Sequence, residues 1–350
     1  MRIMAFGDIH FHHTHRFSHI TDSGYTIREL EHLSCADTLI KLYKEENIDA
    51  VMFLGDAWQA VGDSISGQTL SVVSTFFDKL TKCFDVHVIV GNHDKLTSNS
   101  NVHKLEFLRH FPNIYLYDKP TLGYIVKEDE TCDFVFMPYC THDEEAIRYL
   151  ENVKDKQNKI VISHLELGGI NLGNGVFTQK GVDLALLNQF KMTLQGHYHS
   201  GGSYGHRIQI AGSTQRLSFK DKGIARRNII IYDTKTDVVK RRSFECPDWL
   251  TFTDDNIEDL LNHDNNNYVK VELSTDILLT DKLREKLNQM KDKDVHIDLT
   301  RISVNKQIEM DLSQEDNTGI IRQFVNKSDN TEEQKEALIN EGTRLLEKVS

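Results

Sequence analysis

The sequence contains few cysteines, and they are not arranged for metal binding or redox chemistry. The five cysteines are odd in number and form no Cys-x-x-Cys pair. A disulfide scaffold uses an even set of cysteines, and a structural zinc site uses paired thiolates, so this pattern excludes both. The cysteine usage predicts a protein of the reducing cytoplasm.

The sequence also lacks a signal peptide, long apolar runs and a Walker A motif. No apolar stretch approaches about 18 residues, so we expect no role in a membrane. Without a Walker A motif, any ATPase activity must come from another chain. The 41 Lys and Arg residues are outnumbered by 53 Asp and Glu residues, which gives a net charge of −12. This balance argues against a nucleic-acid binder that acts alone.

Five short segments rich in aspartate and histidine are the most informative feature that is present. They are Gly7-Asp8-Ile9-His10, Gly55-Asp56, Gly91-Asn92-His93-Asp94, Ser163-His164 and Gly196-His197-Tyr198-His199. Such a set can hold two divalent cations roughly 3.5–4 Å apart, which clamp the attacking and leaving oxygens at phosphorus. The mixed oxygen and nitrogen ligands suit Mn²⁺, Fe²⁺ or Zn²⁺ better than an all-oxygen Mg²⁺ or Ca²⁺ site. The pattern predicts phosphoester hydrolysis.

Each segment follows a short apolar run that we expect to be a buried strand. The runs are residues 2–6, 50–54, 86–90, 160–162 and 192–195. Residues 27–47 and 69–85 have the apolar spacing of helices. Strands that alternate with helices predict a layered α/β domain, in which ligands collect at the carboxyl ends of the strands. We expect His197 and His199 to project to the same side of an extended segment.

The five segments, in this order, resemble the motifs of the calcineurin-like metallophosphoesterase superfamily. Those motifs run Asp-x-His, Gly-Asp, Gly-Asn-His-Asp/Glu, His and Gly-His-x-His. The resemblance covers about residues 1–245 and implies a metallophosphoesterase α/β sandwich. It implies that one cation is held by Asp8, His10, Asp56 and His199. The second would be held by Asn92, His164 and His197 together with Asp56, which bridges the two.

The resemblance also implies a catalytic role for His93, which would face the phosphate and protonate the leaving alkoxide or stabilise the transition state. A histidine suits this role because its pKa lies near working pH. Asp94 either orients His93 or stabilises the turn. Gln59 stands three residues after Asp56, where many family members have a histidine or aspartate. This departure bears on efficiency or strand preference rather than on the metal site.

A stretch after the last motif indicates which family within the superfamily the chain resembles. Residues 211–219 read Ala-Gly-Ser-Thr-Gln-Arg-Leu-Ser-Phe, and Lys220-Asp221-Lys222-Gly223 follows. This is similar to the Gly-Ser-Pro-x-Arg-x-x-Phe…Lys-Gly stretch of the SbcD family, the nuclease subunits of DNA double-strand-break repair complexes. Residues 55–61, Gly-Asp-Ala-Trp-Gln-Ala-Val, differ from the Gly-Asp-x-Val-Asp-Arg-Gly of protein serine/threonine phosphatases. This difference argues against the phosphatase branch of the superfamily.

The SbcD resemblance implies a DNA exo/endonuclease that hydrolyses phosphodiesters by two-metal catalysis. Mn²⁺ would be its cation, with Mg²⁺ as the alternative. Its partners would be DNA and an SbcC-type coiled-coil ATPase, in a heterotetramer that contains a homodimer of this chain. It would act in DNA repair, recombination or replication in a bacterial or phage-infected cytoplasm.

Basic residues gather in one part of this acidic chain. Residues 216–242 contain nine basic and three acidic side chains. One reading is a strip that steers DNA phosphates to the metals, and the other is charge that protects edge strands from aggregation. The residues that we assign to DNA binding are Arg216, Lys220, Lys222, Arg226 and Arg227.

We divide the chain into a nuclease domain (residues 1–246), a small β-α-β cap (247–305) that in SbcD-type proteins contacts DNA, and a linker with a C-terminal helical pair (306–350). The second helix opens with Thr331-x-x-Gln334, a capping-box pattern. The apolar side of the pair either folds back onto the cap or docks on the ATPase. We assign partner binding to Phe324, Val325, Leu338 and Leu345.

Two other functions stay open. One is a phosphodiesterase for cyclic nucleotides or other small molecules, and the other is a scaffold that has kept the fold and binds an ATPase. The cap, the 212–219 stretch and the basic residues favour DNA, and the intact ligand set argues against a scaffold. A histidine cluster after the first motif belongs either to an exposed loop or to a contact with substrate or a neighbouring subunit. Its members are His12, His13, His15 and His19.

Overall fold

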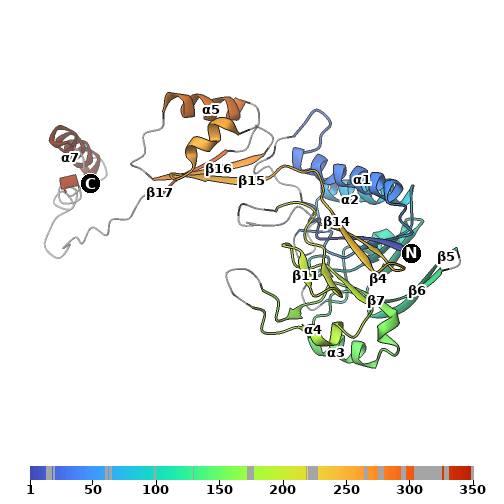
Figure 1. Cartoon of the computed structure of the whole chain (residues 1–350). Helices are drawn as coiled ribbons and strands as arrows, with labels where there is room; N and C mark the ends of the chain where they lie inside the picture. Colours follow the sequence, from blue (N-terminus) through green and yellow to red (C-terminus); the bar gives the residue numbers. More distant parts are fainter. Residues whose placement is uncertain are drawn as a thin grey trace. The chain divides into compact units, whose positions relative to one another are not determined.

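A computed structural model gives the fold of the chain (Figure 1). It describes all residues except 13–17, 19, 60–61, 63–64, 98–99, 129, 172–176, 218, 220–227, 264–266, 275–279, 293–296, 303–324, 327–330 and 348–350. The chain divides into two compact units, Met1–Val271 with Thr280–Asp298, and Glu272–Leu279 with Leu299–Ser350. Among the described residues, no helix combines the length and the apolar character needed to cross a membrane.

Two six-stranded sheets form the body of the first unit. The first has the order β14-β13-β1-β2-β3-β4, and its strands are β1 Arg2–Phe6, β2 Ala50–Phe53, β3 Val86–Ile89, β4 Ile114–Tyr117, β13 Ile229–Asp233 and β14 Val238–Arg242. The second has the order β11-β12-β10-β7-β6-β5, and its strands are β5 Thr121–Lys127, β6 Glu130–Met137, β7 Lys159–Ser163, β10 Met192–Gln195, β11 Gly202–Tyr204 and β12 Ile208–Ile210. The central strands pair in parallel, so their carboxyl ends lie at the same edge of each sheet.

The central strands are buried on both faces because alternate residues point in opposite directions. In β1, Ile3 and Ala5 lie in the core between the two sheets, whereas Met4 and Phe6 pack against helices. Helices α1 (Ile27–Glu45) and α2 (Gly67–Thr81) cover the outer face of the first sheet, and α3 (Asp143–Asn152) and α4 (Leu184–Leu187) cover that of the second (Figure 1). The unit is therefore a layered α/β sandwich, which confirms the predicted fold class.

The five predicted strands are all present, as β1, β2, β3, β7 and β10. Both predicted helices occur, and each has a local reason to begin where it does. Thr26 forms a capping box with Glu29 at the start of α1, and the Ser66 side chain accepts from Thr69 N at the start of α2. Residues 114–137 form three further strands, β4, β5 and β6, that the sequence analysis did not predict.

The C-terminal part contains the predicted β-α-β pattern. Helix α5 (Asp281–Asp292) follows β16 (Tyr268–Ser274) and precedes β17 (Ile297–Ile302), and these strands form a sheet of order β15-β16-β17 with β15 (Trp249–Thr253). Short elements complete the chain: η1 Glu106–His110, η2 Lys156–Asn158, η3 Ile257–Asn262, β8 Leu167–Gly168 and β9 Val182–Asp183. The predicted domain boundaries at 247 and 306 stay predictions.

The second helix of the predicted C-terminal pair is α7 (Glu332–Glu347). Its capping box is confirmed, because Thr331 N donates to Gln334 Oε1 at 3.0 Å and Gln334 N donates to Thr331 Oγ1 at 3.3 Å. The first helix of the pair falls mostly outside the described residues, as does the Phe324 position.

Candidate metal centre

The predicted ligands lie in loops that leave the carboxyl ends of five parallel strands. Asp8 and His10 follow β1, Asp56 follows β2, Asn92 and His93 follow β3, His164 follows β7, and His197 and His199 follow β10. Hydrogen bonds join the loops of one sheet to those of the other. His164 Nδ1 lies 2.6 Å from Leu54 O, and His197 N donates to Asp8 Oδ1 at 3.1 Å. The site therefore lies where the two sheets meet.

Four of the predicted ligands have a left-handed backbone conformation. The φ angles are 52° for Asp8, 56° for His10, 56° for Asp56 and 72° for His197. A residue other than glycine rarely adopts this conformation, which costs about 1–3 kcal/mol and persists where the surrounding structure enforces it. Such strain, gathered on four residues of one site, is typical of a functional centre.

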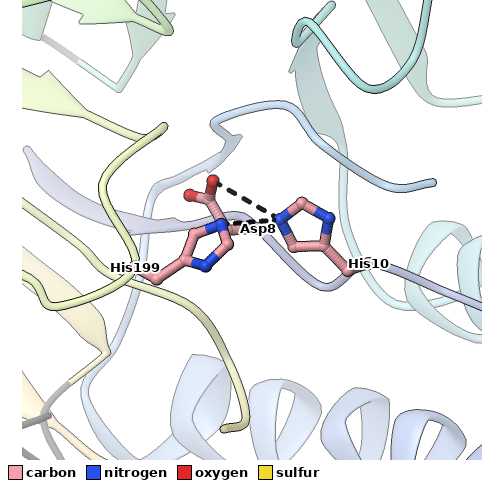
Figure 2. Close-up of side chains that lie close together, drawn as sticks. All are labelled: Asp8, His10 and His199. Carbon is pink, nitrogen blue, oxygen red and sulfur yellow. Dashed lines mark hydrogen bonds and ion pairs between the residues drawn. The ribbon is translucent and has the colours of Figure 1, made fainter. Parts of the chain in front are cut away.

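The first ligand group consists of Asp8, His10 and His199 (Figure 2). His10 Nε2 lies 3.0 Å from His199 Nε2 and 4.0 Å from Asp8 Oδ1. One donor atom from each residue lies within 4.8 Å of the others. Asp8 and His10 are fully buried.

The second ligand group consists of Asp56, Asn92, His164 and His197. Asn92 Oδ1 lies 3.0 Å from His164 Nε2 and 3.0 Å from His197 Nδ1. Asp56 Oδ2 lies 3.3 Å from His164 Nε2 and 3.8 Å from His10 Nε2, a member of the first group. A single carboxylate oxygen thus lies near both groups, the position that a bridging ligand needs.

The segment that carries the last two histidines is not extended, so that part of the sequence analysis was wrong. Tyr198 N donates to Gly196 O at 2.9 Å, which closes a three-residue γ-turn around His197. The turn sends His197 to the second group and His199 to the first. A period-two pattern could not reveal this, because a γ-turn breaks the alternation on which the expectation depended.

Burial and charge set the protonation of the two groups. Burial lowers the pKa of His10 and of His197 to about 3, so both imidazoles are neutral at working pH. Burial raises the pKa of Asp8 to about 8. For Asp56, burial acts to raise the pKa, but the neighbouring His164 outweighs it and lowers the pKa. Burial acts to lower the pKa of His164, and Asp56 reverses this and raises it to about 9.

These donors fit divalent cations. The neutral imidazoles of His10 and His197 are already in the form that ligates a metal, whereas Asp8 and His164 would each release a proton when a cation binds. A cation would also offset the cost of burying two carboxylates in one place. The first group would hold one cation and the second group the other, and when bound they would supply positive charge to the phosphoester and its attacking water.

Comparison with known proteins agrees with this geometry. The sequence profile described as calcineurin-like phosphoesterase matches residues 1–201, more than half of the chain and all five motif segments. The chain belongs to the calcineurin-like phosphoesterase family. Exonuclease subunit 1 of Enterobacteria phage T4 is 26% identical over 202 residues, and the match spans 57% of each chain. The chain thus matches little more than half the length of this relative.

Solved structures resemble the chain more distantly. A dimetal phosphatase from Danio rerio has a TM-score of 0.32 and 13% identity, and the match covers 60% of this chain and 85% of that one. Another solved structure has a TM-score of 0.43 and 11% identity, and the match covers 70% of this chain and 99% of that one.

The Asp94 side chain stabilises this calcineurin-like centre by binding the backbone of two loops. The fully buried carboxylate accepts hydrogen bonds from the backbone N–H groups of Asp56 (2.9 Å), Ala57 (2.9 Å), Trp58 (3.2 Å) and Gly91 (2.8 Å). It thereby ties the loop after β2 to the loop after β3. Of the two roles left open for Asp94, these bonds favour stabilisation of the turn.

His93 is held by a different residue. Its Nδ1 lies 2.5 Å from the backbone oxygen of Gln59, and its backbone N donates to Asp56 Oδ1 at 2.8 Å. The His93 ring lies 4.9 Å from the His10 ring. Gln59 thus contacts the predicted catalytic histidine through its main chain, at the position where the family resemblance leads one to expect a histidine or aspartate side chain.

The predicted DNA-binding residues lie mostly outside the described part of the chain, namely Lys220, Lys222, Arg226 and Arg227. Arg216 is described, and it pairs with Asp248 at 3.2 Å and donates to Trp249 O at 3.3 Å. Lys240 and Arg242, farther along the basic segment, both pair with Glu46. For these three residues the structure shows internal ion pairs, and DNA binding stays a prediction.

The predicted partner-binding residues are described only in part. Val325 is buried and Leu338 is 48% exposed, whereas the Leu345 side chain lies outside the described residues. His13, His15 and His19 also lie outside them. The described member of that cluster, His12, is half-buried, and its Nδ1 lies 2.7 Å from His10 O.

Two side chains near the centre escaped the sequence analysis, Lys95 and Tyr139. The Tyr139 ring lies 6.2 Å from the His197 ring, and Lys95 Nζ lies 5.2 Å from the Tyr139 centroid. Tyr139 follows β6, a strand that was not predicted. Lys95 directly follows the Gly-Asn-His-Asp motif, so its place in the sequence was the signal that could have found it.

A further group of potential ligands, His103, Glu106 and Asp118, lies outside the centre. Arg109 Nε lies 3.0 Å from Glu106 Oε1, and its guanidinium also lies 2.6 Å from Asp118 Oδ2. Because Arg109 already supplies the positive charge that these carboxylates need, this group is an ion-pair network rather than a further metal site.

Proposed function

We propose that the protein is a Mn²⁺-dependent DNA exo/endonuclease and the nuclease subunit of a complex with an SbcC-type coiled-coil ATPase. The observation that carries the proposal is the position of Asp56 Oδ2, 3.3 Å from a nitrogen of one ligand group and 3.8 Å from a nitrogen of the other. Two adjacent cation sites with a shared carboxylate suit in-line attack on a phosphodiester. The match to a phage exonuclease subunit supports a nucleic acid as the substrate and a complex as the working form.

Different residues of the chain bind the cations and donate the proton to the leaving group. The two ligand groups hold the cations, and the Asp94 bonds fix the loops that carry Asp56 and Gly91. His93 uses Nδ1 to contact the Gln59 carbonyl, which leaves Nε2 to donate a proton to the departing oxygen. The Gln59 carbonyl therefore fixes the ring by accepting a hydrogen bond from Nδ1–H, without depending on the Gln59 side chain.

His93→Asn separates binding from chemistry. The variant should keep its bound metal and its affinity for DNA, and its cleavage rate should fall about 10²–10⁴-fold, the usual contribution of a general acid. Metal content by mass spectrometry, DNA affinity and single-turnover cleavage together check this. Cleavage at the wild-type rate would leave His93 without a role in the chemistry.

The proposal is tested by substrate preference. Wild-type protein is assayed on end-labelled linear duplex DNA, on hairpin DNA and on a cyclic nucleotide, in Mn²⁺, Mg²⁺ or EDTA, with and without a co-encoded ATPase. The nuclease function predicts degradation of DNA in Mn²⁺ and none in EDTA. Hydrolysis of the cyclic nucleotide with no degradation of DNA would instead support the small-molecule phosphodiesterase.

A further inference from the structure

Lys95 is a buried lysine that none of the predicted motifs includes. The residue is 7% exposed. Its Nζ donates to Thr141 Oγ1 at 3.2 Å and lies over the ring of Tyr139. Across the described part of the chain, no carboxylate lies within ion-pair distance of this Nζ, and Glu145 acts on it electrostatically from farther away.

A buried ammonium group without a paired carboxylate needs an explanation. Removing such a group from water costs several kcal/mol unless partners replace the lost solvent. Lys82, Lys159 and Lys240 each lie within 2.6–3.2 Å of a carboxylate oxygen. Lys95 has one hydroxyl and one aromatic face, although an ammonium group has three N–H donors. An anionic ligand would complete its environment.

The neighbours of Lys95 place it beside the metal centre. Tyr139 N donates to Val90 O at 2.8 Å, which holds Tyr139 against the end of β3. The Tyr139 centroid lies 5.2 Å from Lys95 Nζ and 6.2 Å from the centroid of the His197 ring, and His197 belongs to the second ligand group. The ammonium group therefore lies on the side of the centre that holds the second ligand group, with one tyrosine ring as the neighbour that it shares with His197.

We propose that Lys95 binds the phosphate adjacent to the scissile one, so that the site selects substrates with at least two phosphates along a chain. The inference rests on the proposed nuclease function and deepens it. An oligonucleotide offers such a neighbouring phosphate, whereas a cyclic nucleotide or a simple phosphodiester has a single phosphate, which the metal centre occupies. The subsite thus discriminates between the two classes of substrate.

The first test measures the charge contact directly, in EDTA, where no cleavage occurs. Lys95→Met removes the charge and keeps an unbranched apolar side chain against Tyr139, and Lys95→Arg keeps the charge. For a labelled single-stranded oligonucleotide, the slope of log K against log salt should fall by about 0.7 in Lys95→Met, the value for one lost phosphate contact. Lys95→Arg should restore the slope. Lys82→Ala, which removes a lysine 70% exposed on the surface, should leave it unchanged.

The second test compares two substrates. In Mn²⁺, kcat/KM of Lys95→Met should fall roughly tenfold further for the oligonucleotide than for bis-p-nitrophenyl phosphate. An equal fall for both substrates, with a lower unfolding midpoint, would show a structural role and overturn the inference, as would an unchanged salt slope. Wild-type protein that hydrolyses bis-p-nitrophenyl phosphate but no oligonucleotide would refute the proposed function and this subsite together. Normal oligonucleotide cleavage by Lys95→Met would refute the subsite alone.

Discussion

Gly91 shows how tightly the centre is built at the scale of single residues. A Cβ at this position would lie 2.1 Å from Asp56 Oδ1 and 2.4 Å from Asp56 N. Those atoms cannot move away freely, because Asp56 N donates to Asp94 and Asp56 Oδ1 accepts from His93 N. The glycine of the Gly-Asn-His-Asp segment therefore provides the space in which the Asp56 carboxylate lies.

Gly91→Ala should displace Asp56, and the variant should lose bound metal and nuclease activity. Gly67→Ala is the matched control, because nothing lies within 4 Å of a Cβ at that position in α2. The control should keep its metal and be unchanged or more stable by up to about 1 kcal/mol, since alanine favours a helix over glycine. Metal analysis and the unfolding midpoint check both variants. A fully metal-loaded Gly91→Ala protein would contradict the account of this contact.

Residue identities predicted which side chains come together, because those side chains follow apolar runs within motifs; their role as metal ligands stays a prediction. The contacts of Gln59 and Asp94 could not be predicted. Gln59 acts through a main-chain oxygen, which any residue type would offer, and Asp94 binds backbone N–H groups whose positions depend on the fold. The contact between Lys95 and Tyr139 could not be predicted either, because the two residues are far apart in the sequence.

At the scale of elements, a buried arginine joins α1 to strands β15 and β16. Arg28 is 1% exposed, and its guanidinium lies 5.4 Å from the Trp249 ring and 5.3 Å from the Tyr268 ring. It pairs with Glu31 at 2.7 Å, and Tyr268 Oη donates to the same glutamate at 2.7 Å. This cluster connects the α/β sandwich to the segment where the predicted cap begins.

Arg28→Met should lower the free energy of unfolding by about 3–5 kcal/mol, because it leaves the largely buried Glu31 carboxylate with the Tyr268 hydroxyl but no cation. Lys82→Ala is the control, since its ion pair with Asp78 is exposed and should change stability by less than about 1 kcal/mol. Denaturant unfolding gives both values. Equal, small losses in the two variants would show that the Arg28 cluster does not stabilise this junction.

The five strands that the sequence predicted are those that end at a motif, whereas strands without a motif, among them the buried interior strands β6 and β13, were not predicted. A strand such as β2 is buried on both faces and reads as an apolar run, Ala-Val-Met-Phe. The edge strand β5 instead alternates the exposed residues Leu122, Tyr124 and Val126 with half-buried ones, so its apolar residues do not mark a fully buried strand. The arrangement of the five predicted strands in two sheets depends on pairing between distant segments, which local patterns do not encode.

At the scale of the whole molecule, the C-terminal helices have two predicted roles, packing on the cap or docking on an ATPase. A chain truncated near Asn305 should stay soluble and keep Mn²⁺-dependent nuclease activity if the helices dock on the ATPase, and it should lose co-purification with that partner. If they complete the core of this protein instead, truncation should lower the melting temperature and cause aggregation.

A pair of substitutions sharpens this test in the full-length chain. Leu338 is 48% exposed in α7, and Leu338→Asp should weaken binding to the ATPase. Asn340→Asp adds the same charge two residues later, at another exposed position, and should leave binding unchanged. Unchanged affinity in both the truncated chain and Leu338→Asp would rule out docking through α7.

The central claim concerns the whole centre: two cations share the Asp56 carboxylate. Metal content per chain, measured by mass spectrometry after dialysis against Mn²⁺, tests it most directly. Wild-type protein should bind two ions, and His199→Ala should keep one, because His199 belongs to the first ligand group alone. Asp56→Ala should fall below two ions and lose all nuclease activity. Two ions at full occupancy in Asp56→Ala would contradict the bridging role of Asp56.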